Sequence, residues 1–330
     1  NFVTIVVKTM TRKLFSLTLS AFALLLLMGA GVEQSSAALV SESDGTAAEA
    51  AVRQVDAEQD QEADRAEPVP AVAGGSVLTL VENLDRTLTV DGEPVSTEVG
   101  KTQRNGTTYV ALVPMAKELD PTASAAWDAG SRTVTVTSGK LTLTAVVGQQ
   151  YVVANGRYLY VPEGVGLTGN RVTVPLSVLT EAFDADLNWN GATGTVAVTR
   201  GSGGLTPGNQ FYNEKDLFWL SRVIYAESGN QPLDGKIAVG NVIMNRVKSP
   251  IFPNTVEGVL AQKNQFTTYR SGKLAGCTPN ASSVAAAKLV LDGAVVEKTK
   301  NALYFDSAPN SWAARNRTCI AVIGGHRFYA

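Results

Sequence analysis

The chain has 330 residues, of which 45% are hydrophobic and 18% are charged, with a formal net charge of −2. This length allows two or three domains, and the composition excludes disorder throughout the chain. His326 is the only histidine, and Cys277 and Cys319 are the only cysteines. These counts exclude zinc sites built on several histidines or on four thiolates, and histidine-rich copper sites. The sequence implies no metal and no organic cofactor.

The near-neutral total conceals segments of opposite charge. The net charge is +3 over residues 1–32, −8 over 33–75, −3 over 76–210 and +6 over 211–330. A cationic C-terminal part favours an anionic partner such as a cell envelope, and salt should weaken that attraction.

Residues 1–38 contain upstream residues followed by the pattern of a signal peptide. Arg12 and Lys13 precede an apolar run of fifteen residues, 14–28, and residues 36–38 are small enough for cleavage. The apolar run is shorter than the roughly 20 residues that span a bilayer. The pattern predicts export and no stable transmembrane segment after cleavage, with an uncleaved membrane anchor as the alternative.

Residues 39–75 are rich in Ala, Glu, Asp and Gln and hold few large apolar side chains. Little apolar surface is available to offset the entropy of ordering, so the segment is predicted to be a disordered acidic linker. Export also bears on the cysteines, because a pair in an oxidising compartment is more often a disulfide than two free thiols. We therefore expect Cys277 and Cys319 to be bonded to each other.

Residues 76–200 contain short alternating runs separated by turn signals such as Asp91-Gly92 and Asn155-Gly156, which are typical of β-hairpins. Residues 110–134 and 172–196 follow one pattern: an apolar run ending in proline, a short helical stretch, and a tryptophan followed by Asp or Asn. This pattern indicates an internal duplication. The helical stretches are expected from Pro114 to Leu119 and from Pro175 to Phe183.

The duplicated pattern resembles the copper amine oxidase N-terminal domain, a bacterial stalk module, over about residues 80–200. The resemblance implies a β-rich stalk that contacts the cell envelope. It implies no copper, because the segment has no histidine or cysteine. Trp127 and Trp189 occupy the same place in each copy, so we expect them to anchor the core, with sugar-stacking platforms as the alternative.

Residues 201–212 are rich in Gly and Ser at their start and are predicted to be a flexible joint. Asn213 then caps a predicted helix whose first turn carries Glu214 and Asp216, where acids suit the helix dipole. Its apolar residues recur at helical spacing, and the same spacing places Glu227 at the end of the apolar stripe. A second helix is expected from about Leu233 to Val247.

The predicted position of Glu227 disfavours its ionised form. Partial burial and the negative end of the helix dipole each raise the pKa of a carboxyl group. A carboxylic acid that stays protonated near neutral pH is what donating a proton to a glycosidic oxygen requires. The alternative is a side chain that only turns toward solvent at a frayed helix end.

Residues 214–330 carry several motifs in one order: Tyr225-Ala226-Glu227-Ser228, Asn241-Val242, Asn245-Arg246-Val247, Gln265-Phe266-Thr267, Ala302-Leu303-Tyr304-Phe305 and Gly325-His326-Arg327-Phe328-Tyr329. Together they resemble the SleB/CwlJ cell wall hydrolases, a family known for lysis of spore-cortex and cell-wall peptidoglycan. The resemblance implies a lysozyme-like α+β catalytic domain over residues 213–330, after the β-rich duplicated stalk. It also places the family's catalytic glutamate on Glu227.

The resemblance further implies lytic transglycosylase chemistry on peptidoglycan glycan strands. Glu227 would protonate the oxygen between N-acetylmuramic acid and N-acetylglucosamine, then accept the muramyl 6-hydroxyl proton and leave a 1,6-anhydro end. Hydrolysis by two carboxylates would need a second acid roughly 5–9.5 Å away. Asp234, Glu257 and Asp306 are the candidates.

Five further residues are candidates for substrate binding: Asn245, Gln265, Phe266, Tyr304 and His326. An amide beside an aromatic face suits a sugar ring, which favours Gln265 and Phe266. Asn245 could instead fix the following loop, Tyr304 could fill the core, and a lone histidine is more often structural.

Two other functions remain open from the sequence. One is a cysteine peptidase of wall peptides that uses Cys277 and His326, and the other is a wall-binding protein without catalysis. In each case the protein is expected to be secreted, in the cell wall or spore envelope of a bacterium, and not to bind nucleic acid.

Overall fold

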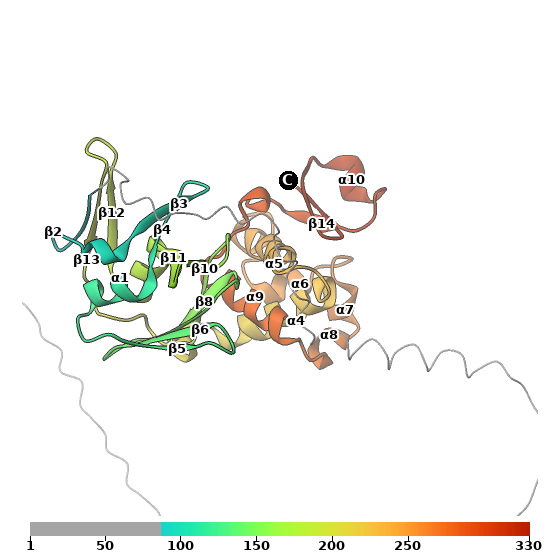
Figure 1. The fold of residues 1–330 in the computed structure, drawn as a ribbon. Coiled ribbons are helices and arrows are strands. Elements are labelled where there is room, and N and C mark those ends of the chain that lie inside the picture. The colour runs from blue at the N-terminus through green and yellow to red at the C-terminus, as the bar shows by residue number, and fades with distance from the viewer. Residues whose placement is uncertain (1–86) are drawn as a thin grey trace, which may run out of the picture. The chain divides into compact units, whose positions relative to one another are not determined.

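The computed structural model describes residues 87–330, so the predicted export signal and acidic linker lie outside the described residues. Residues 87–200 form a β-rich domain and residues 208–330 a mainly helical domain with one small sheet (Figure 1). Among the described residues, no helix combines the length and apolar character needed to cross a membrane.

The β-rich domain contains three sheets. One has the order β5-β6-β7-β8-β9, with strands Ser124–Asp128, Thr133–Thr137, Thr142–Val146, Tyr151–Ala154 and Arg157–Tyr160. The second has the order β12-β13-β1-β2, with strands Asp186–Asn190, Thr195–Thr199, Leu88–Val90 and Glu93–Pro94. The third has the order β10-β11-β4-β3, with strands Gly166–Thr168, Arg171–Pro175, Thr107–Ala111 and Lys101–Arg104. A 3-10 turn, η1, spans Thr97–Val99.

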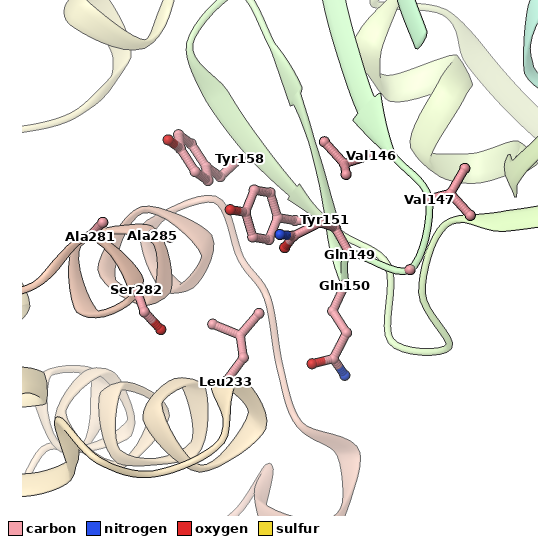
Figure 2. Close-up of a pocket in the computed structure, with 11 residues that line it drawn as sticks. Val146, Val147, Gln149, Gln150, Tyr151, Tyr158, Leu233, Ala281, Ser282 and Ala285 are labelled. Carbon is pink, nitrogen blue, oxygen red and sulfur yellow. The ribbon is translucent and has the colours of Figure 1, made fainter. Parts of the chain in front are cut away.

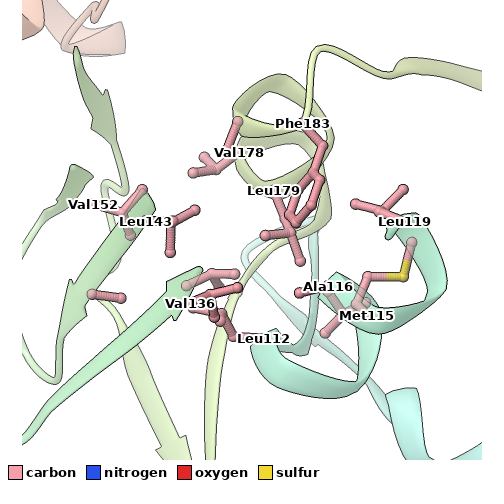
Figure 3. Packing of buried hydrophobic residues seen from close by; sticks show 14 of the residues in the cluster. Leu112, Met115, Ala116, Leu119, Val136, Leu143, Val152, Val178, Leu179 and Phe183 are labelled. Atoms are coloured by element: carbon pink, nitrogen blue, oxygen red, sulfur yellow. The ribbon is translucent and has the colours of Figure 1, made fainter. Parts of the chain in front are cut away.

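The structure has the internal duplication that the sequence predicts. Each copy runs strand, helix, strand, strand: β4-α1-β5-β6 and β11-α2-β12-β13, where α1 is Leu112–Leu119 and α2 is Leu176–Ala182. The two copies meet at β4 and β11, which pair antiparallel with Val110 opposite Val174. Figure 3 shows apolar side chains of both helices facing Val136, Leu143 and Val152 of the five-stranded sheet, so the two copies share one core.

The two repeated tryptophans do not anchor this core, contrary to the prediction. Trp127 and Trp189 are each 50% exposed. Both lie on edge strands, β5 and β12, opposite Val134 and Val196 of the neighbouring strands. An edge strand has a neighbour on one side only, which leaves each indole half uncovered.

The segment predicted as a flexible joint is packed against the β-rich domain. Leu205 is buried, and Asn155 donates from Nδ2 to its carbonyl oxygen at 3.0 Å. A Cβ atom on Gly204 would lie 2.4 Å from the Lys140 carbonyl oxygen, and one on Gly208 would lie 2.5 Å from that of Gly156. The glycines therefore permit close backbone approach here instead of free rotation.

The first long helix of the helical domain begins where the sequence predicts. Asn213 accepts a hydrogen bond at Oδ1 from the Asp216 amide at 3.0 Å and caps α4, Glu214–Ser228. The second predicted helix is α5, Leu233–Lys248. The remaining helices are α3 Gly208–Phe211, α6 Val256–Leu260, α7 Thr267–Arg270, α8 Lys273–Gly276, α9 Ala281–Leu291, the 3-10 turn η2 Glu297–Thr299 and α10 Trp312–Asn316.

The core of this domain lies where α4, α5 and α9 pack on one another (Figure 1). Apolar residues at helical spacing on each helix are fully buried there, among them Ile224, Val239 and Leu289. A small antiparallel sheet of order β14-β16-β15 completes the domain, with strands Tyr304–Asp306, His326–Tyr329 and Cys319–Ile323. Phe328 of its central strand is fully buried in the same core, and β14 lies against α5.

Candidate active site

Glu227 is the second-last residue of α4 and is half-buried. The preceding apolar stripe of Leu220, Val223 and Ile224 faces the core, and helical spacing carries Glu227 to the edge of that buried face. Burial raises the pKa of its carboxyl group, because water no longer solvates the charged form fully. The sequence predicted both the position and the direction of this pKa shift.

Glu227 lines a pocket of about 220 Å³. The other lining residues come from α5, the turn before α7, β14 and β16: Arg246, Gln265, Phe266, Phe305, Asp306, Ser307 and His326. Three of the five predicted binding residues, Gln265, Phe266 and His326, therefore lie in one pocket with Glu227. The pocket combines the carboxyl groups of Glu227 and Asp306 with amide, aromatic and cationic groups.

Arg246 is the main pocket residue that the predicted site lacked. It is only 3% exposed, donates from Nε to the Leu303 carbonyl oxygen at 2.8 Å and from Nη1 to Gln265 Oε1 at 3.0 Å. Because the oxygen of the Gln265 amide is occupied, its NH₂ group remains to donate to a ligand. Counting by three and four from Val239 reaches Arg246, so the spacing that identified Glu227 also places this arginine on a buried face.

His326 begins β16 and is 8% exposed. Burial lowers the pKa of its imidazole, while the nearby Asp306 and a hydrogen bond to the Glu227 backbone act in the opposite direction. Its ring packs against Phe305 at 5.6 Å between ring centroids. His326 thus ties the small sheet to the backbone of the glutamate whose side chain lines the pocket.

Asp306 is the one candidate second carboxylate that lies in the pocket. Asp234 is held outside it by Tyr160 at 2.7 Å and Gln150 at 3.0 Å. Glu257 instead pairs with Lys215 at 2.5 Å. Asp306 accepts a hydrogen bond at Oδ2 from Ser311, and its buried Oδ1 has no hydrogen-bond partner within residues 87–330.

Two predicted binding residues do not line the pocket. Asn245 donates from Nδ2 to the carbonyl oxygens of Lys300 and Ala302, both at 2.9 Å, so its amide fixes a loop. Tyr304 is the first residue of β14, and the Arg246 guanidinium lies over its ring. The same ring contacts those of Phe252 and Trp312. This geometry therefore does not support direct substrate contact by Asn245 or Tyr304. The spacing of the sequence motifs gave no sign of the carbonyl groups and rings that these two side chains contact.

The predicted disulfide is absent, because both cysteines are free thiols. Cys277 follows α8 and donates from Sγ to the Leu274 carbonyl oxygen at 3.2 Å, packed against the helical core. Cys319 is exposed at the start of β15. The pocket that holds His326 does not include Cys277, so the structure does not assemble a cysteine–histidine pair there. Within residues 87–330, no group of three or more His, Cys, Asp or Glu residues is placed to hold a metal ion.

Comparison with protein families matches two parts of the chain. Residues 89–198 match the copper amine oxidase N-terminal domain, and residues 230–329 match the cell wall hydrolase family. The second match covers every pocket residue named above except Glu227, which lies just before its start.

Several curated relatives are spore cortex-lytic enzymes. That of Bacillus cereus is 37% identical over 120 residues, or 36% of this chain and 45% of the relative. That of Oceanobacillus iheyensis is 30% identical over 148 residues, or 44% of this chain and 52% of the relative. The Bacillus subtilis enzyme is 32% identical over 120 residues, or 36% of this chain and 38% of the relative. This chain thus spans about half the length of the curated relatives it matches, or less.

Among solved structures, the catalytic domain of the germination-specific lytic transglycosylase SleB from Bacillus anthracis is 34% identical, with a TM-score of 0.34 over 38% of this chain and 100% of that chain. The catalytic domain of Bacillus cereus SleB is also 34% identical, with a TM-score of 0.33 over 39% of this chain and 100% of that one. The family matches give the assignment: residues 230–329 belong to a domain of the cell wall hydrolase family, and residues 89–198 form a copper amine oxidase N-terminal domain.

Proposed function

We propose that this protein degrades peptidoglycan by cleaving the bond between N-acetylmuramic acid and N-acetylglucosamine, with Glu227 as general acid and then general base. The observation that carries the proposal is a half-buried carboxyl group of raised pKa in a pocket that also holds amide and aromatic groups. The cell wall hydrolase match and the relatives named as spore cortex-lytic enzymes support the substrate class.

The first step is a proton transfer from Glu227 to the glycosidic oxygen. The protonated form suits this step because burial keeps the proton on the carboxyl group to higher pH. The Gln265 NH₂ group, oriented by Arg246, can donate to a sugar acetamido or hydroxyl oxygen. Phe266 and Phe305 offer apolar surface to the sugar ring.

The second step returns the proton to Glu227. The carboxylate accepts the proton of the muramyl 6-hydroxyl while that oxygen forms a bond to C1, which yields a 1,6-anhydro end and restores the acid. One carboxyl group therefore suffices. This route is lytic transglycosylation on a lysozyme-like domain.

The position of Asp306 in the same pocket favours a second candidate reaction, hydrolysis by two carboxyl groups. A second carboxylate in the same pocket could activate water or stabilise positive charge at C1, which would give hydrolysis and a reducing muramic acid end. Its buried, unpartnered Oδ1 within the described chain is the specific observation that favours this route.

We propose further that the protein acts outside the cell, in the cell wall or spore envelope, and that its β-rich domain contacts the envelope. The exposed Trp127 and Trp189 side chains support the second point, because exposed aromatic faces on a stalk are suited to glycan contact.

The test is digestion of purified peptidoglycan by the wild type and by Glu227→Gln, Asp306→Asn and Cys277→Ser, with mass spectrometry of the fragments. We expect anhydromuramyl ends, reduced at least about 100-fold in Glu227→Gln, as for loss of a general acid. Glu297→Gln, which removes an exposed acid outside the pocket, is the matched control.

The other outcomes separate the competing functions. Reducing muramic acid ends that disappear in Asp306→Asn would favour hydrolysis. New amine ends lost in Cys277→Ser would identify a peptidase, and no cleavage by the wild type would leave a wall-binding protein.

A further inference from the structure

A second and larger pocket, of about 500 Å³, lies apart from Glu227. Figure 2 shows its walls: the β7–β8 hairpin and β9 of the β-rich domain on one side, and the first turns of α5 and α9 on the other. Pockets for small ligands have volumes of roughly 300–1,000 Å³, so this one has the size for a sugar unit.

Two tyrosines form the aromatic wall of this second pocket. Tyr151 of β8 and Tyr158 of β9 lie with ring centroids 5.2 Å apart and their planes tilted by 35° (Figure 2). Both rings pack partly against the helical core. Burial raises the pKa of the Tyr151 hydroxyl, so at neutral pH this side chain presents an uncharged ring with a hydroxyl edge. Such faces stack on the C–H face of a sugar ring.

Polar groups border the tyrosines. The exposed side-chain amide of Gln149 makes no hydrogen bond to any residue within 87–330, so both its donor and its acceptor can serve a ligand. Ser282 accepts a hydrogen bond at Oγ from Lys236 Nζ at 2.9 Å. Its own hydroxyl proton is therefore directed away from the ammonium and can be donated into the pocket.

Lys236 is a positioning residue in this arrangement. It is 5% exposed, and burial lowers the pKa of its ammonium group. Among the ion pairs of residues 87–330 none includes Lys236, and Asp234, two residues before it in the chain, is engaged by Tyr160 and Gln150. Burying an ammonium in this way is costly, and it fixes the orientation of the Ser282 hydroxyl.

We propose that this pocket is a second saccharide-binding site, which takes N-acetylated sugar units of a glycan strand away from the bond that is cleaved. The sugar class rests on the proposed function, and the tilted pair of tyrosines, the Gln149 amide and the oriented Ser282 hydroxyl fit such a ligand. An acidic stem peptide is less suited, because the nearby cations are already engaged: Lys236 by Ser282, Arg157 by Asp292, and Lys288 over the Tyr158 ring.

The loop between α4 and α5 connects the two sites. It begins two residues after Glu227, at Gly229, whose carbonyl oxygen accepts a hydrogen bond at 3.4 Å from Nδ2 of Asn280, the cap of α9. The second pocket begins at the other end of that loop, at Leu233, and at the first residues of α9. A bound strand would thus hold the enzyme on an insoluble polymer between cleavage events.

The first experiment measures binding without cleavage. N-acetylglucosamine hexamer and peptide-free glycan strands are titrated by calorimetry into full-length Glu227→Gln, with Tyr151→Ala, Tyr151→Phe or Ser282→Ala added. We expect Tyr151→Ala to weaken one class of sites at least tenfold, Ser282→Ala to weaken it less, and Tyr151→Phe to preserve it.

Leu167→Ala, which removes an exposed apolar side chain of the same domain outside the pocket, is the matched control and should bind normally. Unchanged sugar binding in a folded Tyr151→Ala protein would overturn the proposal. Tyr151-dependent binding of an unlinked stem tripeptide, without sugar binding, would overturn the saccharide assignment.

The second experiment separates this inference from the proposed function. With Glu227 present, Tyr151→Ala should raise the KM for whole sacculi several-fold and leave kcat on a short soluble glycan unchanged. If the wild type cleaves no peptidoglycan, the proposed function is refuted, while the calorimetric titration still tests sugar binding in the second pocket. Normal cleavage together with Tyr151-independent binding would refute the inference alone.

Discussion

At the scale of single residues, the α4 terminus holds Glu227 in surroundings that oppose its ionisation. The same helix could end in Leu or Lys without this cost, because an apolar side chain suits the buried stripe and a cation suits the helix C-terminus. Catalysis by a protonated carboxyl group gives a reason for a glutamate at this position. The cost is measurable as a pH-dependent loss of stability.

Glu227→Gln is expected to stabilise the fold increasingly as pH rises. Burial raises the folded-state pKa of Glu227 above its unfolded value. Its contribution to the free energy of folding is therefore fully present below the unfolded pKa and is lost as pH rises through the folded pKa. Thermal melts from pH 4 to pH 8 should show equal midpoints at the acid end and a higher midpoint for Glu227→Gln at the alkaline end.

The proton of Glu227 should also limit activity at high pH. Cleavage by the wild type is expected to fall as pH rises through the raised pKa, because the acid form is lost.

The control for the thermal melts is Glu297→Gln, which changes an exposed acid and should follow the wild-type melting curve at every pH. A constant difference between Glu227→Gln and wild type across this range would contradict the raised pKa.

Part of the candidate site could be predicted from single residues. Helical spacing and local motifs led to Glu227, Gln265, Phe266 and His326, and the structure brings all four into one pocket. For Asn245 the sequence left substrate binding and loop fixation both open, because a polar side chain gives no sign of which backbone carbonyl it will meet. Arg246 was missed as a pocket residue because a base in the last turn of a helix is also explained by the helix dipole.

At the scale of elements, the strands and helices were predicted better than the segments between and beside them. Caps and apolar periodicity predicted α4 and α5 to within a residue of their ends. The segment from residue 201 was predicted as flexible because Gly permits both mobility and close packing, and the Lys140 and Gly156 carbonyl groups that it meets are distant in sequence. The prediction that Trp127 and Trp189 anchor the core was wrong for a related reason, because the sequence does not show which strands lie at the edge of a sheet.

Gly240 of α5 is expected to resist substitution, although alanine is the better helix former. A Cβ atom there would lie 2.8 Å from Val290 Cγ2 of α9 and 3.0 Å from Ile224 Cδ1 of α4. Both neighbours are buried, so they have little room to move. Overpacking costs roughly 1–3 kcal/mol and helix propensity returns about 1 kcal/mol, so Gly240→Ala should lose up to about 2 kcal/mol in urea unfolding.

Gly235→Ala on the same helix is the matched control. Its nearest contact would be Gln231 Cβ at 3.2 Å, in the loop before α5, which can adjust more easily than the three-helix core. We expect its free energy of unfolding to change by less than that of Gly240→Ala. A Gly240→Ala protein as stable as wild type would show that α4, α5 and α9 are less closely packed than the structure indicates.

At the scale of the whole molecule, the family matches divide the described residues into two domains, but polar contacts join those domains. Arg157 of β9 donates from Nε to Asp292, which follows α9, at 2.6 Å, and their side chains are only 10% and 2% exposed. Tyr212, before α4, donates to the same carboxylate, and Tyr160 reaches Asp234 of α5. These contacts involve both domains and border the second pocket, so that pocket depends on them.

The last prediction is that Asp292 couples the unfolding of the two domains. Removing one partner of a buried ion pair costs roughly 3–5 kcal/mol, because the other charge is left without compensation. In Asp292→Asn, Arg157 keeps only its longer contact with Glu181 at 3.8 Å, and the Tyr212 and Tyr158 contacts weaken. Calorimetry should change from one cooperative transition of residues 87–330 in the wild type to two, with the helical domain melting separately.

Arg200→Ala provides the control for loss of a charged pair. Its partner is Asp91 at 2.6 Å, both within the β-rich domain and with side chains 41% and 39% exposed, so the expected cost is below about 1 kcal/mol. That variant should keep a single transition. The second pocket is lined by residues of both domains, so it requires them to stay packed together. Asp292→Asn should therefore also lose Tyr151-dependent sugar binding, while Arg200→Ala keeps it. A single, unshifted transition in Asp292→Asn would show that the apolar contacts of Tyr151, Tyr158 and Tyr160 couple the domains without the ion pair.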